Sequence, residues 1–574
     1  MTRARSEHDG TAVLRIASIW FEGAEAKRDA RARGGVRALD AEQPVEQLLR
    51  AVPAWKLLPI VPQLGSRLGS GAPSDDALHA VLVRVALAHP HHVLPLLISL
   101  CNGHALSADE RTATFAPDRA KLDAARRAIA LIREGRPTAR AMIDEYQLLA
   151  GAYLQLAWAD AKPLVNALQL QGRPTRGPHR IDALPRAKPA DSKAAGGGPP
   201  LLQLPMPFRH AAVLTAPLPV VPRDELDLRA RATPDDNDVS APDDDDDDGI
   251  VRVASFGGTF TTPGGINLPK AISCYGNDGR CYAQLVKGRD DLRQDAVMQQ
   301  LFGRMNELLA MDTSARARRL ALRTYRVVPL APTAGVLEWV RGTLTMGSWL
   351  VDAHARWRPQ DWAQKRCRER LAAEQPRKRS DAAILGAYRE VCEHLRPVMH
   401  RWLVERWPDA PSWHEHRVTY TRSFAAASMA GYVVGLGDRH PSNVLLDEGT
   451  AEAVMIDLGI AFDQGKLLPT PERVPFRLTR DVVDGFGVCG VEGTFRRCAE
   501  ATMHVLRRSS EQLLTLLQVL LHDPLFKWTL SPTLALRKQL DRAPPDEGGA
   551  VACAGGAPAA PRLSLIHISE PTRR

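Results

Sequence analysis

Residues 435–459 read GLGDRHPSNVLLDEGTAEAVMIDLG, and this stretch decides the fold. Residues 444–456 contain two short β-type runs separated by an Asp-Glu-Gly-Thr turn, which predicts a β-hairpin. Asn443 and Asp457 flank the hairpin almost symmetrically, so we expect their side chains to lie side by side. Amide and carboxylate oxygens are ligands that Mg²⁺ accepts in proteins. The hairpin therefore predicts a site where these two residues share metal ions.

Asp438 precedes Asn443 at the spacing found in the protein-kinase pattern H-R-D-x-x-x-x-N. Phosphoryl transfer needs an acceptor for the hydroxyl proton and ligands that hold metal ions on the phosphates. Asp438 suits the first role, and Asn443 with Asp457 suits the second. His440 follows the aspartate here, where it can donate to the transferred phosphate or hold the loop. The alternative is an ordinary hairpin with two solvated polar ends.

Lys287 ends a β-type run, residues 281–287, and a lysine at a strand end can reach nucleotide phosphates. A helical pattern over residues 291–309 follows, with acids at its start. Either Asp290 or Asp295 is a candidate ion-pair partner for Lys287. The alternative is a surface lysine beside acids that cap a helix.

Gly264 and Gly265 form the candidate phosphate loop, within Thr-Pro-Gly-Gly at residues 262–265. Two glycines permit close approach of backbone to phosphate. The loop lacks the G-x-G-x-x-G pattern, so an ordinary turn is the alternative.

Composition places the chain among globular proteins of two to four domains, since it has 574 residues, 44% of them hydrophobic and 25% charged. The net charge of +9 is too small and too spread out to argue for DNA binding by itself. No cysteine pair forms C-x-x-C, which disfavours a zinc site. We find no signal peptide and no apolar stretch of about 18 residues or more.

The pattern changes several times along the chain. Residues 1–170 favour helices, best seen in an apolar stripe at steps of three and four from Ile143 to Leu156. Proline, glycine and the six aspartates Asp243–Asp248 predict a linker over 171–250. A metal site in the aspartate run is the alternative there. Residues 251–340 favour strands around one helix, 341–540 favour helices around the hairpin, and 541–574 are of low complexity. A small β-rich lobe before a larger helical lobe predicts an α+β, two-lobed kinase domain preceded by a helical segment.

Several long segments resemble the phosphatidylinositol-3-kinase-related protein kinases, in particular the DNA-damage branch. They are Gln284–Gln300, Gly335–Thr343, Gly435–His440, Ile456–Asp484, Gly490–Arg497 and Asp523–Thr529. Residues 1–170 look like the last helices of that family's FAT region. The resemblance covers roughly residues 12–540 and is weakest over 171–250. It implies a kinase domain of the phosphatidylinositol 3- and 4-kinase type.

The resemblance also implies residue roles. Lys287 looks like the phosphate-binding lysine, with Asp290 as its acidic partner, and Tyr325 resembles the inner-pocket tyrosine. The hinge that holds adenine matches Leu337, Glu338, Trp339 and Val340, with backbone contacts at Glu338 and Val340 and stacking on Trp339. The implied ligands are ATP with Mg²⁺ or Mn²⁺.

The function implied is serine/threonine protein kinase activity at Ser/Thr-Gln sites in DNA-damage signalling and repair. Protein substrates, a DNA-end-sensing complex, homodimerisation through the FAT region and a nuclear location come with it. A phosphoinositide kinase is the first alternative. Between Asp457 and Pro475, Lys466 and Arg473 are opposed by Asp463 and Glu472, which gives an anionic lipid headgroup little positive charge and favours protein.

An inactive truncated fragment is the second alternative. Compared with the family, we expect a helical solenoid before the FAT region and a FATC segment at the end to be missing. Residues 563–573 resemble the translation of a sequencing adapter and are excluded from fold reasoning. We expect residues 187–200, 241–250 and 563–574 to be disordered.

Overall fold

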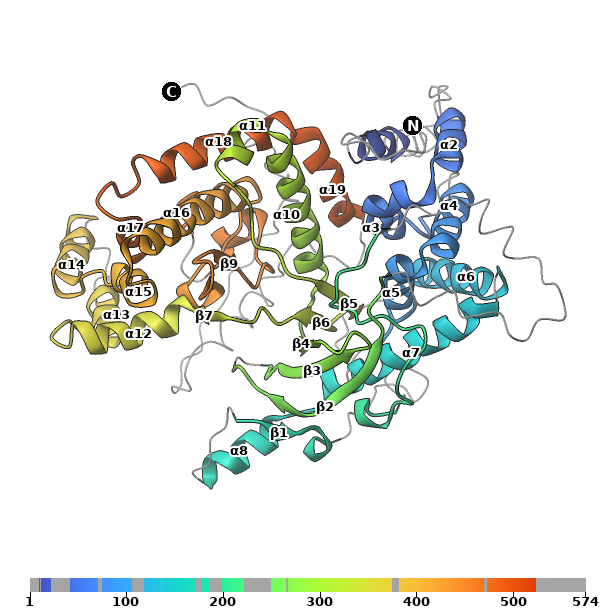
Figure 1. Cartoon of the computed structure of the whole chain (residues 1–574), viewed down its shortest axis with the longest axis horizontal. Coiled ribbons are helices and arrows are strands. Elements are labelled where there is room, and N and C mark those ends of the chain that lie inside the picture. The colour runs from blue at the N-terminus through green and yellow to red at the C-terminus, as the bar shows by residue number, and fades with distance from the viewer. Residues whose placement is uncertain are drawn as a thin grey trace, which may run out of the picture. The chain divides into compact units, whose positions relative to one another are not determined.

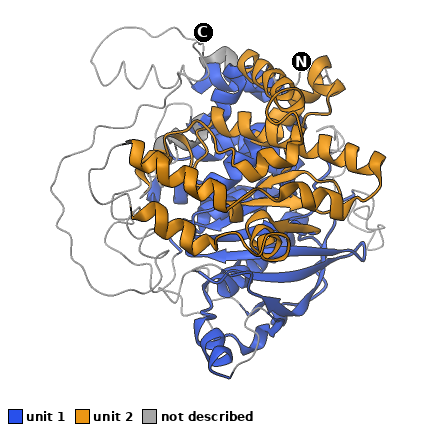
Figure 2. Ribbon diagram, turned by 90° about the vertical axis from the view of Figure 1, so that its left-hand side faces the viewer, with its two compact units in different colours: residues 1–301, 325–341, 510–561 blue, residues 302–324, 342–509, 562–574 orange. Residues whose placement is uncertain are grey.

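The computed structural model divides into two compact units, shown in different colours in Figure 2. The first unit comprises residues 1–301, 325–341 and 510–561, and the second comprises 302–324, 342–509 and 562–574. The structure describes residues 10, 12–21, 42–70, 75–105, 118–135, 137–171, 177–185, 199–220, 249–264, 267–373, 381–468 and 472–522. The predictions of disorder at 187–198, 241–248 and 563–574 lie outside these residues, as does Gly265.

The helical part of the first unit confirms the stripe pattern. Its longest helix, α7 (Pro137–Trp158), buries Ile143, Tyr146, Leu149 and Tyr153, none more than 2% exposed. Its other helices are α2 (Glu42–Ala51), η1 (Ala54–Ile60), α3 (Val61–Ser66), α4 (Asp75–Ala88), α5 (Pro90–Cys101), α6 (Arg119–Gly135), α8 (Lys162–Leu170) and α19 (Ser510–His522). Helix α19, far away in sequence, packs against α3.

A six-stranded antiparallel sheet completes the first unit, in the order β1-β2-β3-β4-β6-β5. The strands are β1 (His179–Arg180), β2 (Val253–Thr261), β3 (Lys270–Gly276), β4 (Cys281–Gly288), β5 (Val327–Ala331) and β6 (Ala334–Glu338). Helix α7 packs against β4, β5 and β6, as Figure 1 lets the reader follow. This packing joins the helical segment to the sheet in one unit.

Pieces of the predicted linker belong to this sheet. Strand β1 pairs with β2, and residues 211–213 exchange backbone hydrogen bonds with residues 251–253. Ile181 and residues 201–208, which include the short helix η5 (Leu201–Gln203), supply buried apolar side chains such as Leu204 and Phe208. Prolines mark the segment as irregular, but its apolar residues still pack.

The second unit is helical around a small sheet, as the sequence predicts. Strands β7 (Thr343–Thr345), β8 (Val444–Asp447) and β9 (Ala453–Met455) form that sheet in the order β7-β8-β9. The helices are α11 (Thr313–Ala317), α12 (Met346–Trp357), α13 (Gln364–Ala372), α14 (Asp381–His394), α15 (Met399–Arg406), α16 (Ala410–Val433), η6 (Pro441–Asn443), η7 (Phe462–Leu467), α17 (Arg480–Phe486) and α18 (Thr494–Arg508). Helix α10 (Arg293–Met311) begins in the first unit and ends in the second.

Helix α16 is the centre of the second unit because its apolar side is buried against its neighbours. It packs against α17, α18 and β9, and Tyr420 and Phe424 contact the Phe486 ring. Its start is fixed by Asp409, whose side chain accepts the Ser412 amide at 3.0 Å. No helix among the described residues is both long and apolar enough to span a bilayer.

Candidate active site

The predicted hairpin forms with the expected register. Val444 pairs with Met455, and the Ile456 amide donates to the Asn443 carbonyl at 3.1 Å. Asn443 therefore lies opposite Ile456, which is the residue before Asp457 in the chain. The backbone brings the two predicted metal ligands to the same end of the hairpin.

Arg439 ties the two ends of this hairpin to the loop that carries Asp438. Its guanidinium donates to the carbonyl of Ile456 at 2.7 Å and to that of Asp457. It also donates to Gly437 O at 2.9 Å and to Asn443 O at 3.4 Å. One half-buried side chain, next to Asp438 in the chain, thus bonds the backbone carbonyls of Gly437, Asn443, Ile456 and Asp457.

Asp438 and Asp457 both have left-handed backbones, with φ values of 59° and 58°. Such a conformation is uncommon outside glycine, although Asp and Asn tolerate it better than most residues. Its cost is about 1–3 kcal/mol per residue, and it persists where the surroundings over-determine it, often in active sites. Such surroundings are the Arg439 bond to the Asp457 carbonyl and, at Asp438, the bond of its amide to Glu472 and that of Asn443 Nδ2 to its carbonyl.

The Asn443 side chain is held by the backbone of Asp438. Its Nδ2 donates to the Asp438 carbonyl at 2.9 Å, which turns the amide oxygen away from that carbonyl. The side chain is 6% exposed, and Asp457 is half-buried. An amide oxygen and a carboxylate are hard ligands, so the donor set fits Mg²⁺ or Mn²⁺. Among all the described residues, those of this site included, no three or more His, Cys, Asp or Glu side chains are grouped so that they could hold a metal ion, so the two proposed ligands are one amide and one carboxylate.

Glu472 is a residue of this loop cluster that the sequence pattern did not single out. Its carboxylate accepts the Asp438 amide at 3.0 Å, while its own amide donates to Gly465 O at 3.0 Å. Glycines 437 and 465 make room for it, since a Cβ at either would lie 2.7 Å from Glu472 Oε2. In the sequence, Glu472 counted only as one acid of the activation segment.

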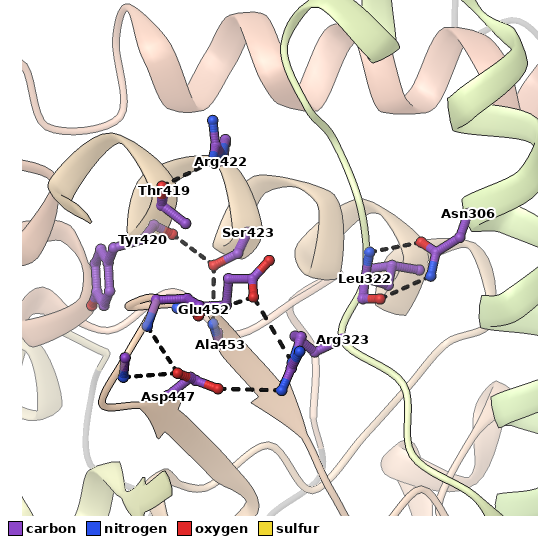
Figure 3. A network of polar contacts seen from close by, with 12 residues as sticks. Asn306, Leu322, Arg323, Thr419, Tyr420, Arg422, Ser423, Asp447, Glu452 and Ala453 are labelled. Atoms are coloured by element: carbon purple, nitrogen blue, oxygen red, sulfur yellow. Dashed lines mark hydrogen bonds and ion pairs between the residues drawn. The ribbon is translucent and has the colours of Figure 1, made fainter. Parts of the chain in front are cut away.

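The closed end of the hairpin is held by a second network (Figure 3). Asp447 accepts the amides of Gly449 and Thr450 at 2.9 and 2.8 Å, and its other oxygen lies 3.2 Å from Arg323. The Ala453 amide donates to Ser423 of α16 at 3.0 Å. The hairpin is thereby fixed at both ends within the second unit.

The segment that carries Arg323 is fixed in turn by α10. The Asn306 side chain accepts the Leu322 amide at 2.7 Å and donates to the Leu322 carbonyl at 2.8 Å (Figure 3). His440 lies half-buried just before η6, and its carbonyl accepts the Asn443 amide at 2.8 Å.

Lys287 and Asp290 meet in the first unit. Lys287 Nζ lies 3.2 Å from Asp290 Oδ2, with 18% of the lysine side chain and 29% of the aspartate side chain exposed. The Asp290 amide donates to Thr333 O at 3.0 Å, which fixes the residue after β4. Asp295, the other candidate partner, is 3% exposed in the first turn of α10.

The predicted hinge residues also lie in the first unit. Leu337 and Glu338 end β6, and Val340 follows. Tyr325 is 5% exposed and its amide donates to the Gln299 side chain at 3.1 Å, whereas the Trp339 side chain is 38% exposed. In the candidate phosphate loop, Gly264 has a φ of 103°, a conformation that favours glycine.

The predicted site residues therefore form two groups. Asp438, His440, Asn443 and Asp457 belong to the second unit, and the nucleotide-binding candidates around Lys287 belong to the first.

Comparison with known proteins gives consistent relatives. The model of the family "Phosphatidylinositol 3- and 4-kinase" matches residues 281–530. The serine-protein kinase ATM of Sus scrofa is 38% identical over 559 residues, which cover 93% of this chain and 16% of that protein. The serine/threonine-protein kinase tel1 of Schizosaccharomyces pombe is 48% identical over 291 residues, which cover 50% of this chain and 10% of that protein. The chain thus spans about a sixth or less of these two relatives.

Solved structures agree with these relatives. The FAT and kinase domain of CtTel1 matches with a TM-score of 0.70 at 30% identity, covering 93% of this chain and 33% of that chain. The complete CtTel1 dimer with C2 symmetry matches with the same TM-score and identity, and 18% of its chain is covered.

Proposed function

Residues 281–530 belong to the phosphatidylinositol 3- and 4-kinase family, in a chain homologous to ATM and Tel1 kinases, and on this premise we propose that the chain is an ATP-dependent serine/threonine protein kinase. The observation that carries the proposal is the hairpin. It brings Asn443 and Asp457 to one end; Asn443 bonds the Asp438 carbonyl directly, and Arg439, the residue after Asp438, bonds the carbonyls of Asn443 and Asp457. Proton acceptor and metal ligands at this spacing are the parts that phosphoryl transfer requires.

In this mechanism Asp438 accepts the proton of the attacking hydroxyl, and His440 donates to the transferred phosphate or holds the loop. Asn443 and Asp457 would hold Mg²⁺ or Mn²⁺, which would supply neutralising charge for the phosphates of ATP. Lys287, paired with Asp290, would bind those phosphates, and the predicted phosphate loop of Gly264 and Gly265 would meet them through backbone groups.

One hydrogen bond within the sheet indicates which backbone atoms of the proposed hinge can contact adenine. The Glu338 amide donates to Arg326 O at 2.8 Å, so the contact of Glu338 with adenine uses its carbonyl oxygen. The amide donor then comes from Val340. Trp339 stacks on the base, which its exposure allows, and Leu337, Tyr325 and Asp295 line the inner side.

Protein is the proposed acceptor rather than a phosphoinositide, because of the activation segment. Lys466 and Arg473 are its described cations, and Glu472 is occupied by the Asp438 amide. Leu467 and Val474 are 56% and 65% exposed, which provides apolar surface for a peptide side chain. Residues 469–471 lie outside the described part of the segment. Each Lys or Arg near an anionic membrane contributes only about 1 kcal/mol, so two cations give weak lipid recognition.

Relatives suggest the wider setting. We propose Ser/Thr-Gln acceptor sites, a role in DNA-damage signalling, a nuclear location and a DNA-end-sensing partner. A homodimer through the helical segment is proposed because one matching solved structure is the CtTel1 dimer.

The test is a side-by-side assay of the purified chain with ATP and Mg²⁺ or Mn²⁺. The acceptors are a Ser-Gln peptide, its Ser-Ala counterpart and phosphatidylinositol vesicles. We expect transfer to the Ser-Gln peptide above the other two. Equal rates on both peptides would remove the glutamine preference, and efficient lipid phosphorylation would assign the alternative acceptor. Nucleotide binding without transfer to any acceptor would support an inactive chain.

A further inference from the structure

The C-terminal end of helix α7 meets strands β3 and β4 through a buried lysine. Lys270, the first residue of β3, is 2% exposed, and its Nζ donates to the carbonyls of Ala157 and Ala159 at 3.2 and 2.6 Å. The last carbonyls of a helix have no partner within the helix and carry negative partial charge. The Lys270 ammonium satisfies one of them, Ala157 O, together with the carbonyl of Ala159 just past the helix, and so bonds the strand to the helix end.

Strand β4 touches the same helix end at a glycine. A Cβ added to Gly288 would lie 2.3 Å from Ala157 O and 2.8 Å from Ala157 C. Both atoms are backbone, so neither can move aside as a flexible side chain would. The backbone of β4 therefore rests directly on the last turn of α7.

A third contact lies further along the strand. The Tyr153 hydroxyl of α7 donates to the Gln284 side chain, whose amide donates to Thr215 Oγ1 at 3.0 Å. Tyr153 and Gln284 are both buried, at 1% and 0% exposure. Burial makes this hydrogen bond costly to leave unmade.

Side chains along a strand alternate between the two faces of the sheet, so Lys287 lies on the face opposite α7. Gln284, Val286 and Gly288 are at even positions, and Val286 pairs with Lys270 in the register. Side chains at these positions point toward α7, whereas Lys287 points the opposite way. The helix thus backs the strand directly behind Lys287.

We propose that the end of α7 fixes the position of strand β4, through the backbone contact at Gly288 and the hydrogen bonds of Lys270, and that it thereby positions Lys287 for the phosphates of ATP. Gly288 and Lys270 are positioning residues and touch no nucleotide. The inference rests on the proposed function, because it needs Lys287 to bind phosphate. It makes the helical segment a structural part of the nucleotide site.

The test compares two glycines of the same sheet. Gly288→Ala pushes β4 away from α7, whereas Gly258→Ala in β2 is the matched control, because no atom lies within 4 Å of its added Cβ. We expect Gly288→Ala to raise the KM for ATP about tenfold, since small misplacements of a binding group are costly. The KM for the peptide stays unchanged, and the control behaves like the native chain. A KM for ATP within about twofold of native in folded Gly288→Ala would overturn the inference.

A double-mutant cycle separates positioning from general damage. If Gly288 acts through Lys287, then Gly288→Ala adds no further loss of ATP affinity to Lys287→Met. Additive losses would contradict the proposal. If Lys287→Met alone leaves ATP use unchanged, the proposed role of Lys287 fails, which is a different result from a silent Gly288→Ala.

Lys270→Met keeps the experiment decisive if Gly288→Ala does not fold. It removes the donors to Ala157 and Ala159 and adds no volume at the contact. We expect the same selective rise in the KM for ATP, by about threefold, with Lys162→Met on the exposed start of α8 as control. An unchanged KM for ATP in folded Lys270→Met would refute the proposed role of the Lys270 hydrogen bonds.

Discussion

Replacing Arg439 by Met tests whether one side chain holds the catalytic loop to the metal ligands. Methionine keeps the length of the side chain but donates no hydrogen bond. The substitution leaves the carbonyls of Gly437, Asn443, Ile456 and Asp457 without the guanidinium. The left-handed backbone at Asp457 then loses the bond from Arg439 to its carbonyl, and Gly437, next to the left-handed Asp438, loses its bond as well.

The size of the effect follows from the contacts. The bonds to Ile456 O at 2.7 Å and Gly437 O at 2.9 Å have ordinary hydrogen-bond lengths, and the 3.4 Å contact to Asn443 O adds little. Hydrogen bonds from a charged donor contribute about 1.5–3 kcal/mol each, so two amount to about 3 kcal/mol at the lower limit. That energy corresponds to about a hundredfold change in the ordering equilibrium of the loop. We expect kcat to fall by a factor between about ten and a hundred.

The assay is steady-state transfer to a Ser-Gln peptide, with the Mg²⁺ concentration varied at saturating ATP. Arg439→Met lowers kcat and raises the Mg²⁺ requirement, while Arg439→Lys lies between the variant and the native chain because its ammonium lacks the planar fork. Arg507→Met, at an exposed arginine of α18, is the matched control. A folded Arg439→Met chain with kcat within about twofold of native would refute the proposed role of Arg439 in holding the loop.

Four further outcomes are expected. Asp457→Asn lowers kcat by about a hundredfold and raises the Mg²⁺ requirement, measured by metal titration, because an amide is a weaker ligand than a carboxylate. Glu472→Leu lowers kcat about tenfold, because it removes the acceptor for the amide of residue 438. Glu472→Gln can still accept that hydrogen bond and retains most of the activity. Equal losses in the two variants would contradict the hydrogen-bond role of Glu472. Arg323→Met lowers the free energy of unfolding in urea titrations by less than about 1 kcal/mol, because the Arg323 side chain is 41% exposed. A larger loss would give Arg323 a role beyond the surface ion pair. Burial, and to a smaller extent the charge of Arg289, lowers the pKa of Lys270 from 10.5 to about 8. Between these two pH values the unfolded chain binds more protons than the folded chain, so the free energy of unfolding rises with pH. We expect urea titrations of the Lys270→Met chain to lack this rise.

The sequence predicts the hairpin well because all its determinants are local. The turn, the two strands and the flanking Asn443 and Asp457 lie within a short stretch, and antiparallel pairing does the rest. The Lys287–Asp290 pair is local in the same sense, since a strand end and the following turn bring residues three apart together. Short-range geometry is what a sequence pattern records.

The contacts of the residues that hold this site in place cannot be predicted from a local sequence pattern. Arg439 lies beside Asp438 in the sequence, but nothing in the pattern says that its guanidinium turns back to four carbonyls. Glu472 reaches Asp438 from an irregular segment. Lysine in a strand is usually exposed, so the burial of Lys270 against a helix more than a hundred residues away has no signal in the sequence.

The same division applies to the linker. Proline and glycine predict irregular backbone over residues 171–250, and irregular backbone is present in the described parts. Irregularity does not decide packing, because apolar side chains such as Leu201 and Phe208 are buried whatever their secondary structure. Composition therefore predicted the backbone of the segment but not its attachment to the sheet.

The two groups of site residues share one design. In each, the side chain proposed to meet ATP or metal lies at or just beyond the end of a strand, and a basic side chain that takes no part in the chemistry bonds backbone carbonyls nearby. Arg439 bonds the carbonyl of Asp457 itself after β9, whereas Lys270 bonds Ala157 and Ala159 at the helix end against which β4 lies at Gly288. A strand end alone has freedom to fray, and transfer rates fall steeply when reacting groups shift. Basic side chains bound to backbone carbonyls restrict that freedom without themselves having to meet the ligand.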